Sequence, residues 1–322
     1  MERRSAISVD DSLRRLRMLI VVGKGGVGKT TVAAAAANRA ATLGRRVLLV
    51  DVEGKNELAR LVGGDRLTAR PTVQCTITSP RDEPPVTIDA CTVAPDTALV
   101  EYLDDHGMRQ LSKRLVSSGA VDVIATAAPG IKDLLVLGRI KSLVNSGDYD
   151  LVIVDTPASG HAVSFLLGPR TLANLADSGS IRRQADEVMD ILTSETCEAI
   201  LVTLPEETPV NETLETAAAL RENVGVRIGF VVVNGLLANV PNSPPELLNR
   251  LPVSEREAVA AALTFERSRL LRQREQVRRL AESLDVAQVS LPLRPSTRLD
   301  LDDVGALAAA LGSAELRQAM PT

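Results

Sequence analysis

The chain has 322 residues, of which 45 % are hydrophobic and 24 % are charged, and its formal net charge is −4. This length allows one large α/β domain or two smaller ones, and the charge balance argues against broad attraction to nucleic acid or anionic lipid. No apolar run approaches the roughly 20 residues that a membrane-spanning helix needs. Cys75, Cys91 and Cys197 are widely separated and form no C-x-x-C pair, as expected of free thiols in a reducing compartment. We therefore expect a cytoplasmic protein that binds no nucleic acid.

The order of apolar runs along the chain predicts the fold class. Residues 1–17 carry charges of both signs and lack the apolar stretch of a signal peptide, so we expect a polar lead-in. Short, continuously apolar runs then alternate with helical segments, which is typical of strands covered on both faces. These expected strands are Met18–Val22, Val47–Asp51, Leu151–Asp155, Ile200–Leu204, Ile228–Asn234 and, more weakly, Val286–Leu291. The alternation predicts an α/β fold with a doubly wound, mainly parallel sheet that holds ligands at the carboxyl ends of its strands.

The expected helices differ in how they relate to this alternation. Lys29–Leu43 is Ala-rich and precedes Gly44, whereas Pro209–Val224 has a proline near its start and Gly225 just past its end. Helical insertions are expected at about 92–146, 161–194 and 242–284, with helices at Asp96–Asp104, Met108–Ser117, Ile131–Asn145 and around Arg170–Leu192. No linker rich in Pro, Gly or Ser isolates the first two insertions. We therefore expect one domain over 18–315, with helical insertions on one end of the sheet, and a tail at 316–322.

The segment Gly23–Thr31 reads GKGGVGKTT and fits the phosphate-binding pattern G-x-x-x-x-G-K-[ST] of P-loop nucleotidases. In this pattern glycines turn backbone N–H groups towards phosphate oxygens, Lys29 reaches the terminal phosphates, and the Thr30 hydroxyl holds Mg²⁺. Lys24 occupies a position where most such loops carry no charge, and it indicates the subclass of nucleotide switches that work as face-to-face dimers. The expected nucleotide-binding residues of the loop are Gly25, Gly26, Val27, Gly28, Lys29, Thr30 and Thr31.

A second motif, Asp155–His161, reads DTPASGH and directly follows an expected strand. Asp155 therefore lies where a P-loop enzyme keeps the carboxylate that supports Mg²⁺. Taken alone, the same residue would also suit a cap on a strand–helix turn, but the phosphate loop upstream favours the metal role. Gly160 provides the backbone freedom that a nucleotide-sensing switch needs.

A third candidate site follows the expected strand Val47–Asp51. Asp51 and Glu53 are two residues apart, so in an extended chain both side chains face the same side. A carboxylate at this position could orient the water that attacks a γ-phosphate, whereas the alternative is a solvated charged loop. The location favours a catalytic role but does not decide between the two acids.

Together these motifs resemble the arsenite-pump ATPase (ArsA) and tail-anchored-protein targeting ATPase family, within the deviant Walker A group that includes MinD and ParA. The phosphate loop matches the GKGGVGKTT of the family, and Asp155–His161 is similar to its switch, with variations at Pro157, Ala158 and Ser159. Three further stretches resemble family segments, namely Leu201–Thr213, Val231–Asn234 and Ser290–Arg294. MinD and ParA proteins share the first motif but not the switch that ends in Gly-His. The similarity extends from about residue 18 to 310.

The resemblance implies cofactors and residue roles. ATP and Mg²⁺ would bind together, with Thr30 as a metal ligand, Asp155 supporting the metal through its water shell, and Asn234 reading the adenine. Lys24 would act catalytically by reaching the phosphates of a partner subunit, in a homodimer or a heterodimer with a paralogue, as an arginine finger does. Glu53 aligns with the water-activating Asp of the family.

The sequence leaves the cargo open. Neither clustered thiolates for a metalloid nor a zinc-binding C-x-x-C is visible, and buried positions are the better expectation for all three cysteines. Apolar residues that could face a groove for membrane segments are explained equally well by core packing, and these are Leu134, Leu135, Leu137 and Ile140.

Three functions are compatible with these observations. The first is an ATP-hydrolysing dimeric switch coupled to membrane-linked anion transport or a related stress response. The second is a targeting chaperone for hydrophobic membrane segments, with a membrane-associated or hydrophobic client. The third, a ParA-like positioning ATPase, is disfavoured because no basic DNA-binding face is visible and the Gly-His switch is present.

Overall fold

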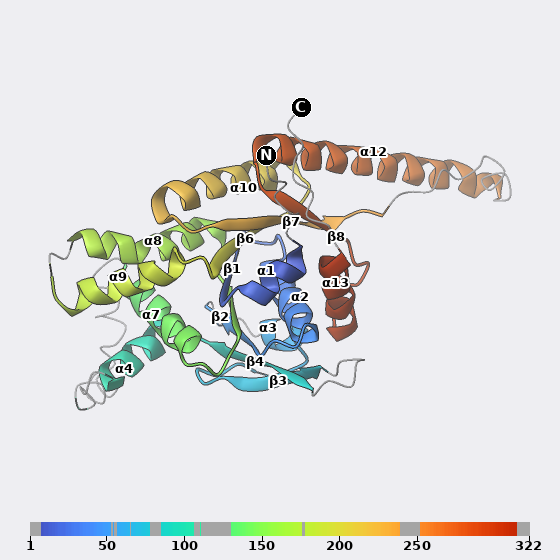
Figure 1. Cartoon of the computed structure of the whole chain (residues 1–322). Helices are drawn as coiled ribbons and strands as arrows, with labels where there is room; N and C mark the ends of the chain where they lie inside the picture. Colours follow the sequence, from blue (N-terminus) through green and yellow to red (C-terminus); the bar gives the residue numbers. More distant parts are fainter. Residues whose placement is uncertain are drawn as a thin grey trace, which may run out of the picture.

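An eight-stranded sheet forms the centre of the protein, in the strand order β3-β4-β2-β5-β1-β6-β7-β8 (Figure 1). The computed structural model describes residues 8–52, 54, 57–64, 66–77, 85–105, 110, 130–175, 178–238 and 252–313. The strands are β1 (Met18–Gly23), β2 (Val47–Asp51), β3 (Thr72–Ile77), β4 (Val86–Thr92), β5 (Leu151–Asp155), β6 (Cys197–Thr203), β7 (Ile228–Leu236) and β8 (Ala287–Pro292). β3 runs antiparallel to β4, whereas the other neighbouring strands run parallel. The predicted doubly wound, mainly parallel sheet is confirmed.

Helices cover both faces of the sheet, and side chains of successive residues in each strand enter opposite cores. Leu19 and Val21 of β1 pack with helices α1 (Val9–Arg15), α2 (Lys29–Thr42), α3 (Glu57–Leu61) and α13 (Leu301–Ser313). Ile20 and Val22 pack on the other face. The helices of that face are α4 (Pro95–Asp105), α7 (Ile131–Asn145), α8 (Ser159–Leu175), α9 (Ser180–Leu192), α10 (Glu207–Ala219) and α12 (Val253–Ser283). Burial on both faces explains why the parallel strands are continuously apolar.

Part of the expected polar lead-in is a packed helix. Ser8 and Asp11 form a reciprocal capping box, because Asp11 N donates to Ser8 Oγ at 3.1 Å and Ser8 N donates to Asp11 Oδ2 at 3.1 Å. Val9 and Leu13 lie on one face of α1 and are buried in the core that α2 shares. The expectation of a lead-in was wrong for these residues, since their charges lie on the other face of a short amphipathic helix.

The helical insertions follow the prediction with two differences. Ile131–Asn145 is α7 as predicted, and α4 extends the expected Asp96–Asp104 by one residue at each end. The stretch predicted as one helix around Arg170–Leu192 consists of two helices. α8 begins earlier, at Ser159, and ends at Leu175, and α9 begins at Ser180. Gly179, just before α9, has a φ of +106°, which a continuous helix does not accommodate. The expected helix Met108–Ser117 lies outside the described residues.

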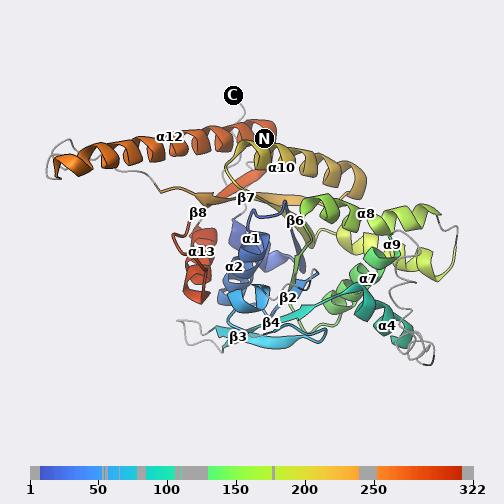
Figure 2. The ribbon, with the colours of Figure 1, turned by 180° about the vertical axis from the view of Figure 1, so that it is seen from behind.

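The third insertion lies apart from the first two. α4, α7, α8 and α9 gather at one side of the sheet, whereas α12 runs beside α10 and projects past β8 in the other direction (Figures 1 and 2).

Strand β6 begins at Cys197 rather than at the predicted Ile200. The charged Glu198 can lie within this buried strand because its carboxylate pairs with Arg15. Every helix in the part of the chain that the structure describes is too short or too polar to span a membrane.

Candidate active site

The phosphate loop connects β1 to α2 through two glycines in left-handed conformations. Gly26 has a φ of +82° and Gly28, the residue before α2, has a φ of +91°. At the start of the loop, a Cβ on Gly23 would lie 2.4 Å from the carbonyl oxygen of Val202 in β6. The glycines are therefore required by backbone conformation and by close strand packing. The loop ends at the N-terminus of a 14-residue helix, which is a favourable place for an anion.

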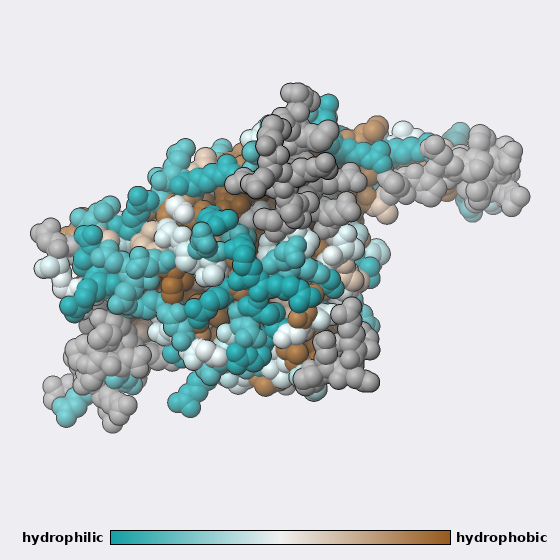
Figure 3. All heavy atoms as spheres, in the orientation of Figure 1, coloured by the Kyte–Doolittle hydropathy of each residue, from teal (hydrophilic) through white to brown (hydrophobic). Residues whose placement is uncertain are grey.

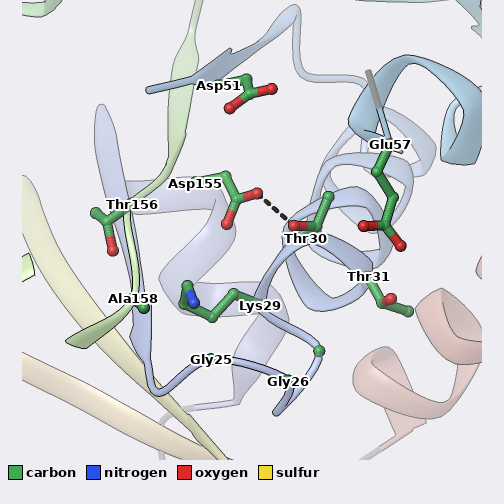
Figure 4. Close-up of a pocket in the computed structure, with 11 residues that line it drawn as sticks. Gly25, Gly26, Lys29, Thr30, Thr31, Asp51, Glu57, Asp155, Thr156 and Ala158 are labelled. Atoms are coloured by element: carbon green, nitrogen blue, oxygen red, sulfur yellow. Dashed lines mark hydrogen bonds between the residues drawn. The ribbon is translucent and has the colours of Figure 1, made fainter. Parts of the chain in front are cut away.

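A cavity opens over this loop, and most of the predicted loop residues line it. Its walls include Gly25, Gly26, Lys29, Thr30 and Thr31 from the loop and the start of α2 (Figure 4). The cavity is also lined by Asp51 and Glu57, by Asp155 at the end of β5, and by Thr156 and Ala158 after that strand. The structure thus brings the phosphate loop and the predicted switch segment to one place.

Two buried carboxylates lie next to each other at the carboxyl ends of neighbouring strands. Asp51 of β2 and Asp155 of β5 are paired in the parallel register, and their exposed fractions are 3 % and 6 %. Asp51 Oδ1 accepts a hydrogen bond from Gly54 N at 3.0 Å. Burying two acids side by side is costly unless positive charge or hydrogen bonds compensate, so this pair is suited to a cation.

The two residues predicted to serve the metal contact each other. Thr30 Oγ1 donates to Asp155 Oδ2 at 2.6 Å, which joins the first turn of α2 to the end of β5 (Figure 4). Thr156 follows Asp155, and its hydroxyl donates to the carbonyl oxygen of Val21 at 2.8 Å. The start of the switch segment is therefore held against β1, beside the phosphate loop.

Asn234, predicted to read adenine, lies against the back of the phosphate loop. Its Nδ2 donates to the carbonyl oxygen of Val27 at 2.9 Å, and a Cβ on Gly28 would approach the same nitrogen to 2.3 Å. Val27 itself is buried beneath the loop. The structure therefore shows Asn234 supporting the loop conformation, and the reading of adenine stays a prediction.

The two lysines of the loop point in different directions. Lys29 Nζ donates to the carbonyl oxygen of Lys24 at 3.2 Å and lies at the cavity. The side chain of Lys24 is turned towards α10, where its Nζ lies 3.3 Å from Glu212 Oε1. Lys24 is not among the described residues that line the cavity over its own loop, and its role towards another subunit stays a prediction.

Only part of the acidic segment after β2 is among the described residues. Glu53 lies outside the described residues, so the choice between Asp51 and Glu53 as the group that orients water stays a prediction. Glu57 is a cavity residue that the sequence analysis missed. Its position at the start of α3 could have been inferred from the apolar Leu58 and Leu61 that follow, which are buried in the core with α2.

The cysteines are distributed through the sheet. Cys91 and Cys197 are buried in β4 and β6, which confirms the expectation for these two, whereas Cys75 is half-buried in β3. Burial raises the pKa of the Cys197 thiol to about 12 and also raises the pKa of Cys75. Neither thiol is activated towards a soft metalloid, because the thiolate is the ligand form.

Comparisons with known proteins point to one family. A model of the family described as anion-transporting ATPase matches residues 16–191. ATPase BagA of Mycobacterium tuberculosis is 34 % identical over 244 residues, which cover 74 % of this chain and 69 % of that protein. A Halobacterium salinarum relative described as an arsenical pump-driving ATPase is 26 % identical, over 89 % of this chain and 43 % of that protein. The ATPase get3 of Schizosaccharomyces japonicus is 28 % identical, over 49 % of this chain and 45 % of that protein.

Proposed function

This chain belongs to the anion-transporting ATPase family, and from that premise we propose that it is an ATP-driven dimeric switch. The resemblance to arsenical pump-driving ATPases and to Get3 is thereby confirmed, and the names of the relatives support an ATPase activity. The observation that carries the proposal is the hydrogen bond between Thr30 and Asp155 beside the phosphate loop, because it brings together two oxygen donors that would hold a cation next to the terminal phosphates.

The proposed nucleotide site uses the loop as a cradle. Backbone N–H groups of Gly25–Thr31 and the ammonium group of Lys29 would bind the β- and γ-phosphates. Asn234, besides supporting Val27, would lie near the base and favour adenine. Mg²⁺ fits the donor set, since the Thr30 hydroxyl and the Asp155 carboxylate are oxygen donors in contact and a second carboxylate, Asp51, lies beside them. When bound, Mg²⁺ would neutralise charge on the phosphates.

Hydrolysis would require a water placed in line with the γ-phosphate. Asp51 is buried at the cavity wall and accepts a bond from Gly54 N, which fixes its orientation. We assign the orientation of water to a carboxylate of this segment, with Glu53 as the residue that aligns with the family pattern. The loop contacts Val202 of β6 and Asn234 of β7, and α2 packs on β1, β2, β4 and β5. The phosphates would therefore be positioned without reorganisation of the backbone.

Dimer formation is proposed from the direction of Lys24. Its ammonium group is directed towards Glu212 of α10 and does not line the cavity over its own loop, so it would reach a facing copy or a paralogue once that ion pair opens. There it would neutralise charge that develops on the transferred phosphate, as an arginine finger does. ATP would then favour the closed pair, and hydrolysis would release it.

The released energy would act on a membrane-linked transport or stress-response partner, by analogy with the relatives named as arsenical pump-driving. A targeting role is supported less well. The four residues considered for an apolar groove, Leu134, Leu135, Leu137 and Ile140, are all buried in the core that α7 shares with its neighbouring helices and the sheet. On the face shown in Figure 3, hydrophilic side chains predominate among the described residues, with small hydrophobic groups between them.

Replacement of Lys24 tests the switch directly. Lys24→Ala should lower the maximal ATPase rate by about 10³-fold or more, because it removes the cation supplied in trans. Nucleotide affinity, measured with a fluorescent ATP analogue, should change only a few-fold. Lys29→Ala is the matched control within the loop and should lose nucleotide binding itself.

Two results would contradict this proposal. Equal loss of binding and turnover in Lys24→Ala would make this lysine a phosphate contact within its own chain. Sedimentation of the wild type that shows no ATP-dependent association would remove the dimeric switch. Glu53→Gln, expected to hold the closed state with ATP, provides bait with which to recover the partner: a transporter subunit supports the first function, and hydrophobic clients along α8 and α9 support targeting.

A further inference from the structure

Lys24 forms an ion pair with Glu212 of α10 within its own chain. The carbonyl oxygen of Lys24 accepts the hydrogen bond from Lys29 on the nucleotide side of the loop, whereas the ammonium group of Lys24 lies on the far side. There it borders a small hollow that is also lined by Gly23, Glu212, Thr213 and Thr216. The backbone and the side chain of one residue thus face two different sites.

Glu212, which pairs with Lys24, belongs to a helix that is packed firmly against the rest of the protein. α10 buries Val210, Thr213, Thr216 and Ala217 against the sheet. Two bonds from Arg279 of α12 hold the solvent side of the same helix, at 2.7 Å to Asn211 Oδ1 and at 3.2 Å to the carbonyl oxygen of Glu207. The position of Glu212 next to Lys24 is therefore set by the packing of α10, and the side chain of Glu212 is only 29 % exposed.

We propose that Glu212 is a positioning residue that holds Lys24 on its own subunit and competes with the nucleotide of the partner subunit. This inference rests on the proposed dimeric switch. The ammonium group cannot keep its 3.3 Å contact with Glu212 and also bind a phosphate across an interface. Closure of the dimer must therefore break the pair, and the pair opposes closure until the partner brings its own ATP.

The size of this opposition follows from the exposure of the pair. A partly exposed ion pair changes an equilibrium by about two- to fivefold, and salt screens it. The pair is thus too weak to block the switch, but it raises the chain concentration needed for activity. The expected benefit is that fewer subunits associate unproductively when the partner subunit carries no ATP.

The test is the dependence of the ATPase rate per chain on chain concentration. Glu212→Gln should lower the concentration for half-maximal rate by about two- to fivefold at low salt, and the difference should shrink as salt rises. The maximal rate at saturating chain should equal that of the wild type. Glu215→Gln is the matched control, because Glu215 is exposed on the same helix and the charge change is identical. It should follow the wild type.

A second measurement separates an ion-pair effect from a structural one. In sedimentation with a non-hydrolysable ATP analogue, Glu212→Gln should favour association in the wild-type background and have no effect in Lys24→Ala. If Glu212→Gln behaves like Glu215→Gln, or lowers the maximal rate at saturating chain, the holding role is wrong. If the wild-type rate per chain is independent of concentration, the dimeric function itself fails and the holding role with it, so the two failures are distinguishable.

Discussion

At the carboxyl edge of the sheet, Thr30, Asp51 and Asp155 border a cavity, whereas at the amino edge the charged groups are engaged in ties within the chain. Arg45 donates to the carbonyl oxygens of Leu13, Arg14, Leu16 and Asp150, and so joins the end of α1 to the start of β5. Arg15 pairs with the buried Glu198. The amino edge therefore stabilises the fold, and the carboxyl edge keeps polar groups for ligand chemistry.

This contrast predicts that changes at the two edges separate stability from activity. Changes at the amino edge should reduce the free energy of unfolding and leave turnover per folded molecule intact. Changes at the carboxyl edge should do the reverse. The three substitutions below test this separation, from the largest expected effect to the smallest.

Leu13→Ala should have the largest effect, and it should fall on stability. Leu13 is fully buried between α1 and α2, so its truncation leaves a cavity and should lower the free energy of unfolding by about 3–4 kcal/mol. Urea denaturation followed by circular dichroism measures this loss, and the ATPase rate per folded molecule should be unchanged. Arg14→Ala, at an exposed position of α1, should change stability by no more than about 0.5 kcal/mol. A loss of turnover in folded Leu13→Ala would break the comparison.

Gly28→Ala should mainly affect activity. Its φ of +91° and the 2.3 Å approach of a Cβ to Asn234 Nδ2 would displace the phosphate loop. A misplacement of about 1 Å can reduce a rate by about 10²-fold, which corresponds to about 2.7 kcal/mol. Steady-state ATPase kinetics and nucleotide titration measure the effect.

Gly44→Ala is the control for the backbone strain in Gly28→Ala. Gly44 has a similar φ of +83°, but a Cβ there meets no atom within 4 Å. It should cost about 1 kcal/mol of stability and keep the ATPase rate per folded molecule. Comparable losses of rate in both variants would show that strain, rather than loop position, decides the effect.

Asp150→Asn should give the smallest effect, visible in the pH dependence of stability. Hydrogen bonds from the Arg46 guanidinium and backbone N–H hold the pKa of Asp150 below its ordinary value. A depressed pKa in the folded state contributes stability above the unfolded pKa, about 3.9, and that contribution is lost as pH falls through the folded value. The melting temperature of Asp150→Asn should therefore fall less steeply than that of the wild type as the pH is lowered below about 4.

Asp190→Asn, at an exposed position of α9, provides the reference for this pH series. It should keep the acid slope of the wild type. An unchanged slope in Asp150→Asn would mean that the ion pair of Asp150 with Arg46 contributes nothing to the stability of the amino edge in solution.

Several features of the fold were predictable because their signals are local. The strands Val47–Asp51 and Leu151–Asp155 were predicted with the observed ends, since buried parallel strands are apolar throughout and end at a charged residue. The capping signal Ser8-x-x-Asp11 was present in the sequence, but the charges around it concealed the apolar face of α1. Glu198 similarly concealed the start of β6. A carboxylate can be buried in a strand only when it has a partner, and here that partner is Arg15, which is distant in the sequence.

The sequence by itself determined the phosphate loop, the carboxylate at the end of β5 and the family, because each rests on residue types at short, fixed spacings. The tertiary structure alone decided which distant groups meet there. The strand order puts Asp51 beside Asp155 and Asn234 behind Val27, and the packing of α10 on β6 presents Glu212 to Lys24. The physical reason is that a periodic pattern specifies which face of an element is buried, whereas its neighbours depend on how all the elements pack together.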